Sequence, residues 1–343
     1  MRLTVGIPTY NRAKFLFDLL ESISHQLRNS EKLDVEILIS DNASTDNTAD
    51  VVRAFKNNNT NILCKYNCNE SNLGYDQNVD KIFHLASGDY VMTLGDDDGL
   101  EANAIPIISA ILRKNFGVKV VYIANCFYDA SFKIKLDINI PFFINVGKSR
   151  YFKSADELFL VTKEVFGGIS GLCLERKSWL ETNVEQYFGT NWIHLGGSLS
   201  ILKKADIYVI TQPLIKYRMD NKAFRWDSLK TSLGIQRVLI DYYEVFPKVI
   251  EDIYIAHRDQ TRKSLLNLDS YSRCVYRKEI LILMKSSYYK KTLPFFLVDV
   301  PMLYCPSVIV KLCRHVIFFL KYIAKLVGAK HLIKYIAKLI GHK

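Results

Sequence analysis

Short apolar runs alternate along the first part of the chain with longer segments in which apolar residues recur at helical spacing. The strand-like runs cover residues 3–7, 35–39, 62–66, 90–94 and 118–127. Helical periodicity fills the intervals between them, most clearly at residues 13–27, 79–86 and 102–112. This order predicts an α/β fold with a mainly parallel sheet and helices on both of its faces.

The pattern changes after the fifth strand-like run. Residues 132–140 alternate between apolar and polar, which is typical of a half-exposed antiparallel strand. A capping box at residues 154–157 opens a helix, and residues 167–174 form a glycine-containing loop that leads into a short strand. Residues 207–217 resemble an edge strand because a proline interrupts them. From residue 228 onward the pattern is predominantly helical.

The formal net charge of +11 is concentrated at the C-terminal end. Residues 301–343 hold eight Lys or Arg and no Asp or Glu. Within them the sequence of residues 320–328 is nearly repeated at 333–341, as an apolar stripe with regularly spaced lysines. This pattern predicts that residues 306–343 form basic amphipathic helices on an anionic membrane surface. Packing on the protein body or an oligomer contact are the alternatives, and the broad apolar surface argues against a nucleic-acid partner.

Other features of the sequence argue against a secreted protein, a membrane-spanning protein and a zinc- or disulfide-based scaffold. The N-terminus runs directly into a strand without the pattern of a signal peptide, and no uncharged apolar stretch reaches the ~18 residues of a membrane span. Seven cysteines, an odd number, are scattered without zinc-site spacing. We therefore expect a cytoplasmic protein with reduced thiols, peripheral on the inner face of the cytoplasmic membrane.

Polar clusters fall directly after four of the predicted strands. They lie at residues 9–12, 41–46, 72–74 and 96–98. In an open parallel sheet, ligands bind beyond the carboxyl ends of the strands. The four clusters therefore predict one ligand-binding crevice at this edge of the sheet.

The cluster Asp96-Asp97-Asp98 has the sharpest chemistry. Three adjacent carboxylates repel one another, and a divalent cation with oxygen ligands, bound together with a diphosphate, would offset that repulsion. The alternative is a solvated turn at the start of the next helix. The cluster at residues 41–46 provides carboxylates for a base or ribose, although such clusters also serve as loops and helix caps.

The motifs at these strand ends resemble those of family 2 glycosyltransferases of the GT-A fold, in order and in spacing. They are Ile7-Pro-Thr-Tyr-Asn-Arg12, Ser40-Asp-Asn-Ala-Ser-Thr-Asp46, Asn72-Leu-Gly74 with Asn78, and Gly88-Asp-Tyr followed by Gly95-Asp-Asp-Asp98. More narrowly, the chain is similar to bacterial O-antigen enzymes of the abequosyltransferase type. That resemblance continues more loosely at Phe166-Gly-Gly and Gly189-Thr-Asn-Trp-Ile-His194.

The resemblance implies a set of donor-binding residues. The nucleotide pocket would be lined by Pro8, Thr9 and Tyr10, with Asn11 and Arg12 beside them, and Asp41 would contact the base. The diphosphate–ribose side would be shaped by Asn72, Gly74 and Asn78. Asp96 would contact the ribose or sugar, and Asp97, with Asp98 next to it, would hold Mn²⁺ or Mg²⁺.

The chain departs from the family pattern at two places. The first Asp of the usual Asp-x-Asp signature falls at Gly95, and no Glu-Asp pair occurs between Tyr187 and Leu202 to supply the catalytic base. His194 lies about where that pair is expected, and an imidazole can act as a base near neutral pH. Its alternative role is a structural histidine beside Trp192. Weaker candidates for the base are Glu164, Glu185 and Asp227.

These expectations combine into one domain scheme and one activity. Residues 1–220 would form a GT-A domain that binds a nucleoside-diphosphate sugar and catalyses transfer, 221–305 a helical extension, and 306–343 the membrane-associating helices. The acceptor would be a hydroxyl of a lipid-linked oligosaccharide. The alternative hypotheses are a nucleotidyltransferase and a non-catalytic membrane-binding protein with a nucleotide-binding fold. A NAD-linked enzyme is disfavoured because no G-x-G-x-x-G follows the first strand.

Overall fold

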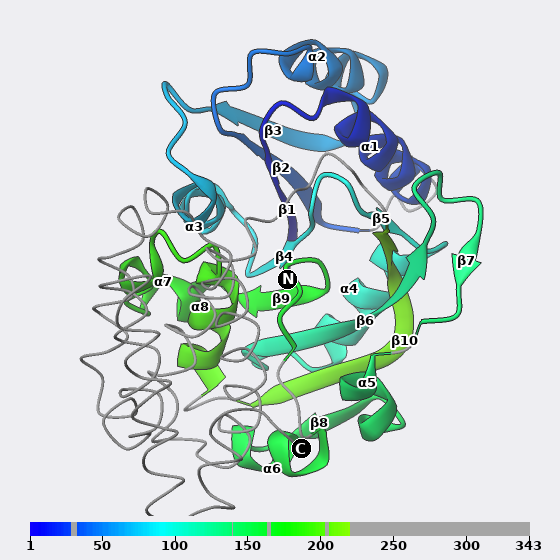
Figure 1. Ribbon diagram of the computed structural model, residues 1–343, viewed down its shortest axis with the longest axis vertical. Coiled ribbons are helices and arrows are strands. Elements are labelled where there is room, and N and C mark those ends of the chain that lie inside the picture. Colours follow the sequence, from blue (N-terminus) through cyan, green and yellow to red (C-terminus); the bar gives the residue numbers. More distant parts are fainter. Residues whose placement is uncertain (29–32, 139, 163–165, 203–205, 220–343) are drawn as a thin grey trace, which may run out of the picture.

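The computed structural model describes residues 1–219 apart from 29–32, 139, 163–165 and 203–205. In this part the chain forms one mixed α/β unit around a single sheet (Figure 1). The proposed helical extension at 221–305, the basic helices at 306–343, and the candidate bases Glu164 and Asp227 lie outside the described residues. Among the described residues, no helix has the length and apolar character needed to cross a bilayer.

The first half of the sheet is parallel, as the sequence predicts. Its strands are arranged in the order β3 (Leu63–Cys68), β2 (Val35–Asp41), β1 (Leu3–Thr9) and β4 (Tyr90–Thr93), with each neighbouring pair parallel. Strands β1 and β2 are buried along their whole length, which explains their near-continuous apolar sequence. Their carboxyl ends therefore meet at one edge, where the polar clusters begin.

The second half of the sheet is mixed. The short β9 (Leu172–Glu175) lies antiparallel between β4 and β6 (Val120–Tyr128), and β10 (Ile207–Arg218) pairs in parallel with β6. Three still shorter strands complete the sheet: β5 (Gly99–Leu100) and β8 (Arg150–Phe152) pair with β10, and β7 (Lys135–Leu136) pairs with β6. Inserting β9 brings the loop at residues 167–171 to the same edge as the polar clusters.

Helices cover both faces of the sheet and bury a separate apolar cluster on each. One cluster includes side chains of α1 (Ala13–Arg28), α2 (Thr48–Asn58) and α4 (Ala104–Lys114). The other includes side chains of α3, α5, α6, α7 and α8, which span Tyr75–Leu85, Pro141–Val146, Ala155–Thr162, Arg176–Leu180 and Ile193–Leu202. A single turn of 3-10 helix, Glu185–Tyr187, leads towards α8. Strand residues alternate between the two clusters, as the period of two requires.

Two predictions about strands need correction. Residues 132–140 do not form a continuous strand: the Asp129 carboxylate accepts hydrogen bonds from the backbone N–H groups of Lys133 and Ile134, which curls the segment into a turn and leaves only β7. Strand β10 is not a bare edge, because β5 and β8 pair along its outer side. Its proline, Pro213, lies where the register with β6 shifts, so its missing N–H interrupts no regular ladder.

Candidate active site

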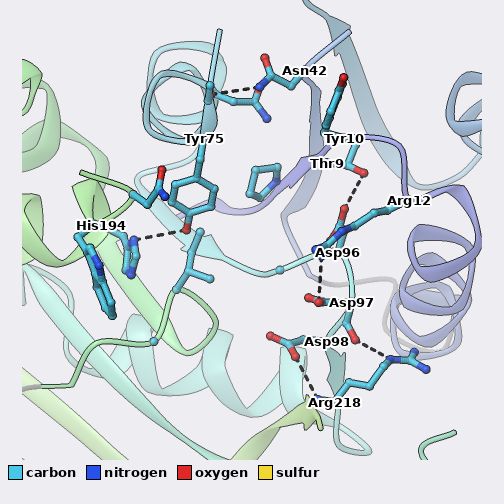
Figure 2. A pocket seen from close by; sticks show the side chains of 18 of the residues that line it. Thr9, Tyr10, Arg12, Asn42, Tyr75, Asp96, Asp97, Asp98, His194 and Arg218 are labelled. Atoms are coloured by element: carbon cyan, nitrogen blue, oxygen red, sulfur yellow. Dashed lines mark hydrogen bonds and ion pairs between the residues drawn. The ribbon is translucent and has the colours of Figure 1, made fainter. Parts of the chain in front are cut away.

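The carboxyl ends of the strands surround one cleft with a volume of about 860 Å³ (Figure 2). Most of the residues predicted to bind the donor, to hold the metal or to act as the base line it. They are Pro8, Thr9, Tyr10, Arg12, Asn72, Gly74, Asn78, Asp96, Asp97, Asp98 and His194. Asn42, Tyr75, Trp192, Tyr217 and Arg218 line it as well, and sequence reasoning had not assigned them to the donor site. The remaining two expected residues, Asn11 and Asp41, are not among the lining residues.

The turn after β1 is held by hydrogen bonds to the loop after β2. Asn11 adopts a left-handed conformation (φ 53°), its N–H donates to Ser44 Oγ at 2.8 Å, and its Oδ1 accepts from Thr45 N at 2.7 Å. Asp46 accepts from the N–H of Ala13 at the start of α1. Asn11 and Asp46 thus hold the turn by contacts outside the cleft lining. The side chains of Tyr10 and Arg12 line the cleft.

Asp41 also lies behind the cleft wall. Its side chain is 1% exposed, and its carboxylate accepts hydrogen bonds from Tyr66 Oη at 2.6 Å and Ser44 N at 2.9 Å. The bond from Tyr66 joins the ends of β2 and β3, and the bond from Ser44 closes the loop after β2. In this arrangement the carboxylate contacts the protein, and its expected contact with a base stays a prediction.

A network of side-chain amides forms the wall next to β2 and α3. Asn42 is 4% exposed; its Nδ2 donates to Asn72 Oδ1 at 2.8 Å and to the Gly74 carbonyl at 3.1 Å. Its Oδ1 accepts from the N–H of Leu73 and from Asn69 Nδ2. These bonds shape the loop before Gly74, whose φ of 84° suits a glycine. We call Asn42, Asn69, Asn72 and Asn78 the amide wall.

Asn78 anchors the amide wall to the sheet. It is 3% exposed, and its amide exchanges two hydrogen bonds with Ser40 of β2, through the hydroxyl and the carbonyl. Its Oδ1 also accepts from Asn69. The wall therefore contains many hydrogen bonds and no charged group of its own.

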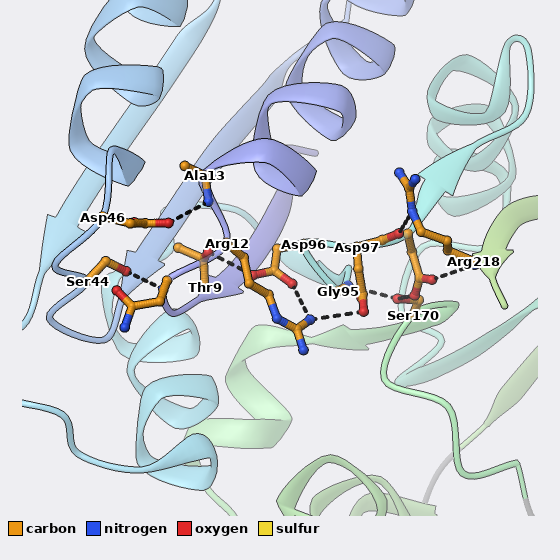
Figure 3. A network of polar contacts seen from close by, with 12 residues as sticks. Thr9, Arg12, Ala13, Ser44, Asp46, Gly95, Asp96, Asp97, Ser170 and Arg218 are labelled. Atoms are coloured by element: carbon orange, nitrogen blue, oxygen red, sulfur yellow. Dashed lines mark hydrogen bonds and ion pairs between the residues drawn. The ribbon is translucent and has the colours of Figure 1, made fainter. Parts of the chain in front are cut away.

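The opposite wall carries the carboxylates (Figure 3). Asp96 is 4% exposed and accepts from Thr9 Oγ1 at 2.8 Å and from Arg12 Nη1 at 2.9 Å. The same Nη1 lies 2.9 Å from Oδ2 of the partly exposed Asp97. Asp98 accepts from the Ser170 hydroxyl and from the backbone N–H of Arg218. We call Asp96, Asp97, Asp98 and Arg12 the charged wall.

Burial raises the pKa of the carboxylates in this wall. The pKa of Asp96 is raised to about 6 by burial and by the Asp97 charge, although Arg12 acts in the opposite direction. The pKa of Asp98 is raised to about 8 by burial, with a further contribution from Asp97. Burial is the largest cause of both shifts and the neighbouring Asp97 charge adds to each, so the wall keeps closely spaced carboxylates away from water. Additional positive charge, or protonation, would stabilise it.

Arg218, at the end of β10, holds the backbone of the loop that carries the charged wall. Its Nε donates to the Asp97 carbonyl at 2.8 Å and its Nη2 to Asp18 of α1, while its guanidinium lies over the ring of Phe132 at 4.0 Å. The side chain is 5% exposed. No local motif identifies this residue, because it acts on a loop about 120 positions earlier in the chain.

Gly95 leaves room for oxygen atoms of the charged wall to converge. A Cβ at this position would lie 3.2 Å from both Asp97 Oδ1 and Asp98 Oδ2 and 3.3 Å from Ser170 Oγ. All three are hard oxygen donors, the type that Mg²⁺ and Mn²⁺ prefer. Over the described residues, no group of three or more Asp, Glu, His or Cys is arranged to hold a metal. The donor set thus fits a cation that takes one or two carboxylates here and its remaining ligands from substrate phosphates and water.

His194 lies on the third side of the cleft, on α8. It is 3% exposed, stacks on Trp192, and has Nε2 3.0 Å from the Gly167 carbonyl and Nδ1 3.4 Å from the Tyr75 hydroxyl. A carbonyl only accepts, so Nε2 carries the hydrogen and Nδ1 presents its lone pair to Tyr75. Burial lowers the pKa of His194 to about 4, and the ring is therefore neutral at pH 7.

The backbone around His194 is positioned by two further features. Asp76 of α3 accepts from the N–H groups of Asn191 and Ile193, which ties the start of α8 to α3. Gly168 passes so close to Tyr217 that a Cβ would lie 2.0 Å from the phenol oxygen, which explains a glycine there. The exposed Glu185, a weaker candidate base, does not line the cleft.

Comparison with known proteins identifies a family match and relatives that cover about three quarters of the chain. Residues 4–183 match the family described as Glycosyl transferase family 2. Abequosyltransferase RfbV of Salmonella typhimurium is 32% identical over 267 residues, which cover 74% of this chain and 76% of that protein. The GalNAc(5)-diNAcBac-PP-undecaprenol beta-1,3-glucosyltransferase of Campylobacter jejuni is 28% identical over 272 residues, with coverage of 76% and 78%.

Solved structures share the fold at low sequence identity. The S. aureus TarS 1-349 complex with UDP-GlcNAc has a TM-score of 0.61 at 12% identity and covers 83% of this chain, which in turn covers 81% of it. Mannosyltransferase PcManGT from Pyrobaculum calidifontis, solved with GDP-Man and Mn²⁺, has a TM-score of 0.52 at 14% identity, with coverage of 85% and 83%. These similarities confirm the predicted GT-A fold.

Proposed function

The chain belongs to glycosyl transferase family 2, and from that premise we propose that it transfers a sugar from a nucleoside-diphosphate sugar to a hydroxyl of a lipid-linked oligosaccharide. The observation that carries this proposal is the single cleft that joins the amide wall, the charged wall and His194. The lipid-linked acceptor is supported by a relative whose name specifies an undecaprenol-linked substrate. Family membership sets aside the nucleotidyltransferase and non-catalytic alternatives, and the abequosyltransferase relative supports a role in O-antigen or another surface polysaccharide.

The two walls suggest how the donor lies. We place the nucleoside against Tyr10 and the amide wall, whose loop geometry is fixed by hydrogen bonds. The diphosphate then lies at Asp97, beside the guanidinium of Arg12, and the transferred sugar at Asp96. Asp97 and Asp98 would hold Mn²⁺ or Mg²⁺, which when bound stabilises negative charge on the leaving diphosphate. Arg12 adds a charge-assisted donor on the same side.

The proton of the acceptor hydroxyl needs a route, and we assign it to Tyr75 and His194. The Tyr75 hydroxyl lies between the cleft and Nδ1 of His194. As the acceptor oxygen bonds to the anomeric carbon, its proton passes to the Tyr75 oxygen and the Tyr75 proton passes to Nδ1. A base of low pKa suffices, because the attacking hydroxyl becomes strongly acidic as that bond forms.

A donor screen tests the proposal. Calorimetry or thermal shift would compare UDP-, CDP-, GDP- and dTDP-sugars, each with and without Mn²⁺. We expect one of them to bind preferentially, with binding strengthened by Mn²⁺ and accompanied by sugar transfer to a lipid-linked acceptor. If no nucleoside-diphosphate sugar binds under either condition, the proposed function is wrong.

We further propose that the protein works at the inner face of the cytoplasmic membrane, where residues 306–343 bind anionic lipid. Replacing Lys321, Lys325, Lys334 and Lys338 with Gln in the full chain should weaken binding to anionic vesicles by up to about 4 kcal/mol at low salt, at ~1 kcal/mol for each charge. Co-sedimentation measures this. Vesicle binding that is indifferent to lipid charge and to salt would contradict the proposal.

A further inference from the structure

Arg12 occupies an unexpected place for a residue of the donor-binding loop. One nitrogen of its guanidinium, Nη1, lies 2.9 Å from Asp96 Oδ1 and 2.9 Å from Asp97 Oδ2 (Figure 3). The side chain is 16% exposed, and the two carboxylates are 5% and 20% exposed. A positive charge of this chain therefore already bridges two of the carboxylates that line the cleft.

The Arg12 guanidinium and a divalent cation would compete for the negative charge of the Asp97 carboxylate. A cation held by Asp97 would share this carboxylate with the guanidinium of Arg12. Arg12 Nη1 is only 2.9 Å from Asp97 Oδ2, so the two positive charges would repel each other at short range. An incoming diphosphate offers the guanidinium an alternative anionic partner, which it can bind through two parallel hydrogen bonds.

The second arginine of the site provides a contrast. Arg218 donates to two backbone carbonyls, those of Asp97 and Ala130, and lies over two aromatic rings, Phe15 and Phe132. These guanidinium contacts hold the loop that carries the carboxylates and involve none of the carboxylate oxygens of the charged wall. The bonds from Arg12 Nη1 go instead to the carboxylates themselves, which are groups that substrate and cation would also use.

We propose that Arg12 is a resident counter-ion that blocks the divalent cation from Asp97 until the donor diphosphate draws the guanidinium away. The free protein then binds Mn²⁺ weakly, and Mn²⁺ and nucleotide bind with positive coupling. By linkage, each ligand strengthens the other by the same factor. This inference rests on the proposed function, since it assumes a diphosphate-bearing donor at the charged wall.

The test is Mn²⁺ binding to the full chain, measured by calorimetry or by electron paramagnetic resonance of free Mn²⁺. Arg12→Gln should bind Mn²⁺ alone about tenfold more tightly than the wild type, because a counter-ion with charge-assisted hydrogen bonds has been removed. Arg12→Met is a second neutral variant in case the first fails to fold. Lys14→Gln, which removes an exposed charge two positions along the chain, should match the wild type.

The nucleotide arm uses UDP, CDP, GDP and dTDP with the same proteins. In the wild type, the nucleotide that binds should raise the affinity for Mn²⁺ about tenfold or more, and in Arg12→Gln that enhancement should shrink. Equal affinity for Mn²⁺ alone in the wild type and in both neutral variants would overturn the inference. Failure of every nucleotide to bind would instead refute the proposed function, while tighter Mn²⁺ binding by Arg12→Gln would still show that Arg12 blocks the cation.

Discussion

The two walls of the cleft are built from different chemistry. The amide wall is neutral, and its buried members Asn42 and Asn78 donate and accept hydrogen bonds within the protein. The charged wall holds three consecutive carboxylates, of which Asp96 and Asp97 contact Arg12, and burial raises the pKa of Asp96 and Asp98. The first arrangement fixes a shape without burying charge, whereas the second buries several charges close together. Damage to the amide wall should therefore reduce stability, and damage to the charged wall should reduce catalysis.

The largest expected effect is that of Asp97→Asn. Loss of this carboxylate removes the group that would hold the cation, and through the cation the diphosphate. Turnover should therefore fall by about 10³-fold or more. Thermal stability should be kept, because one charge of a crowded carboxylate group is removed. Steady-state transfer and thermal melts measure the two effects. Asp50→Asn, at an exposed position of α2, is the matched control, and wild-type turnover in excess chelator would contradict the assignment of a metal to Asp97.

The next largest effect is expected in the proton route through Tyr75 and His194, which lies across the cleft from the charged wall. His194→Ala should slow transfer by roughly 10²–10⁴-fold with donor binding kept. Tyr75→Phe should cause a similar loss, and the double variant should be no slower than either single variant, because both residues act in one relay. Steady-state rates of the four proteins give the answer. A loss below tenfold in His194→Ala, with the fold intact, would leave His194 a structural role.

The buried imidazole also predicts a pH dependence of stability. Burial lowers the pKa of His194 from its ordinary 6.5 to about 4, so between these pH values the unfolded chain binds a proton that the folded chain does not. The free energy of unfolding should therefore fall as pH drops from 6.5 towards 4, by up to about 3 kcal/mol from this group. His194→Gln should lack this component, as denaturant titrations at several pH values would reveal. His84→Gln, at an exposed histidine, should keep it.

The smallest effect on turnover is expected in the amide wall. Asn42→Ala removes a hydrogen-bond acceptor from the buried side-chain amide of Asn69, which should lower the free energy of unfolding by about 1–3 kcal/mol. Turnover at saturating donor should change by less than the loss in Asp97→Asn. Asn57→Ala, at an exposed position of α2 away from the cleft lining, is the control. A stable Asn42→Ala protein with abolished turnover would invalidate the contrast between the walls.

Sequence periodicity was sufficient for the parallel half of the sheet and for the helices over it. Strands β1, β2, β4 and β6 are buried and apolar along a short run, and such runs are visible without knowledge of their neighbours. The position of β9 between β4 and β6 could not be read in this way, because pairing within a sheet depends on contacts far apart in the chain. Residues 132–140 have strand periodicity, but the Asp129 carboxylate accepts hydrogen bonds from the backbone N–H groups of Lys133 and Ile134 and turns the segment.

The site shows the same division between local and distant signals. The strand-end motifs located both walls, since each motif follows directly on its own strand. Asn42 lay inside one of those motifs but had been assigned no role of its own. Tyr75 and Arg218 were missed because their roles arise from contacts with His194 and with Asp97, each more than a hundred residues away in the chain.

The most direct measurement is a crystal structure of the protein with the nucleoside diphosphate selected by the donor screen and Mn²⁺. We expect the base and ribose to lie between Tyr10 and the amide wall, the diphosphate and Mn²⁺ at Asp97, and the Arg12 guanidinium to have moved from Asp97 to a phosphate oxygen. A nucleotide bound outside this cleft, or a diphosphate against the amide wall with Arg12 still bridging Asp96 and Asp97, would contradict the proposed donor site.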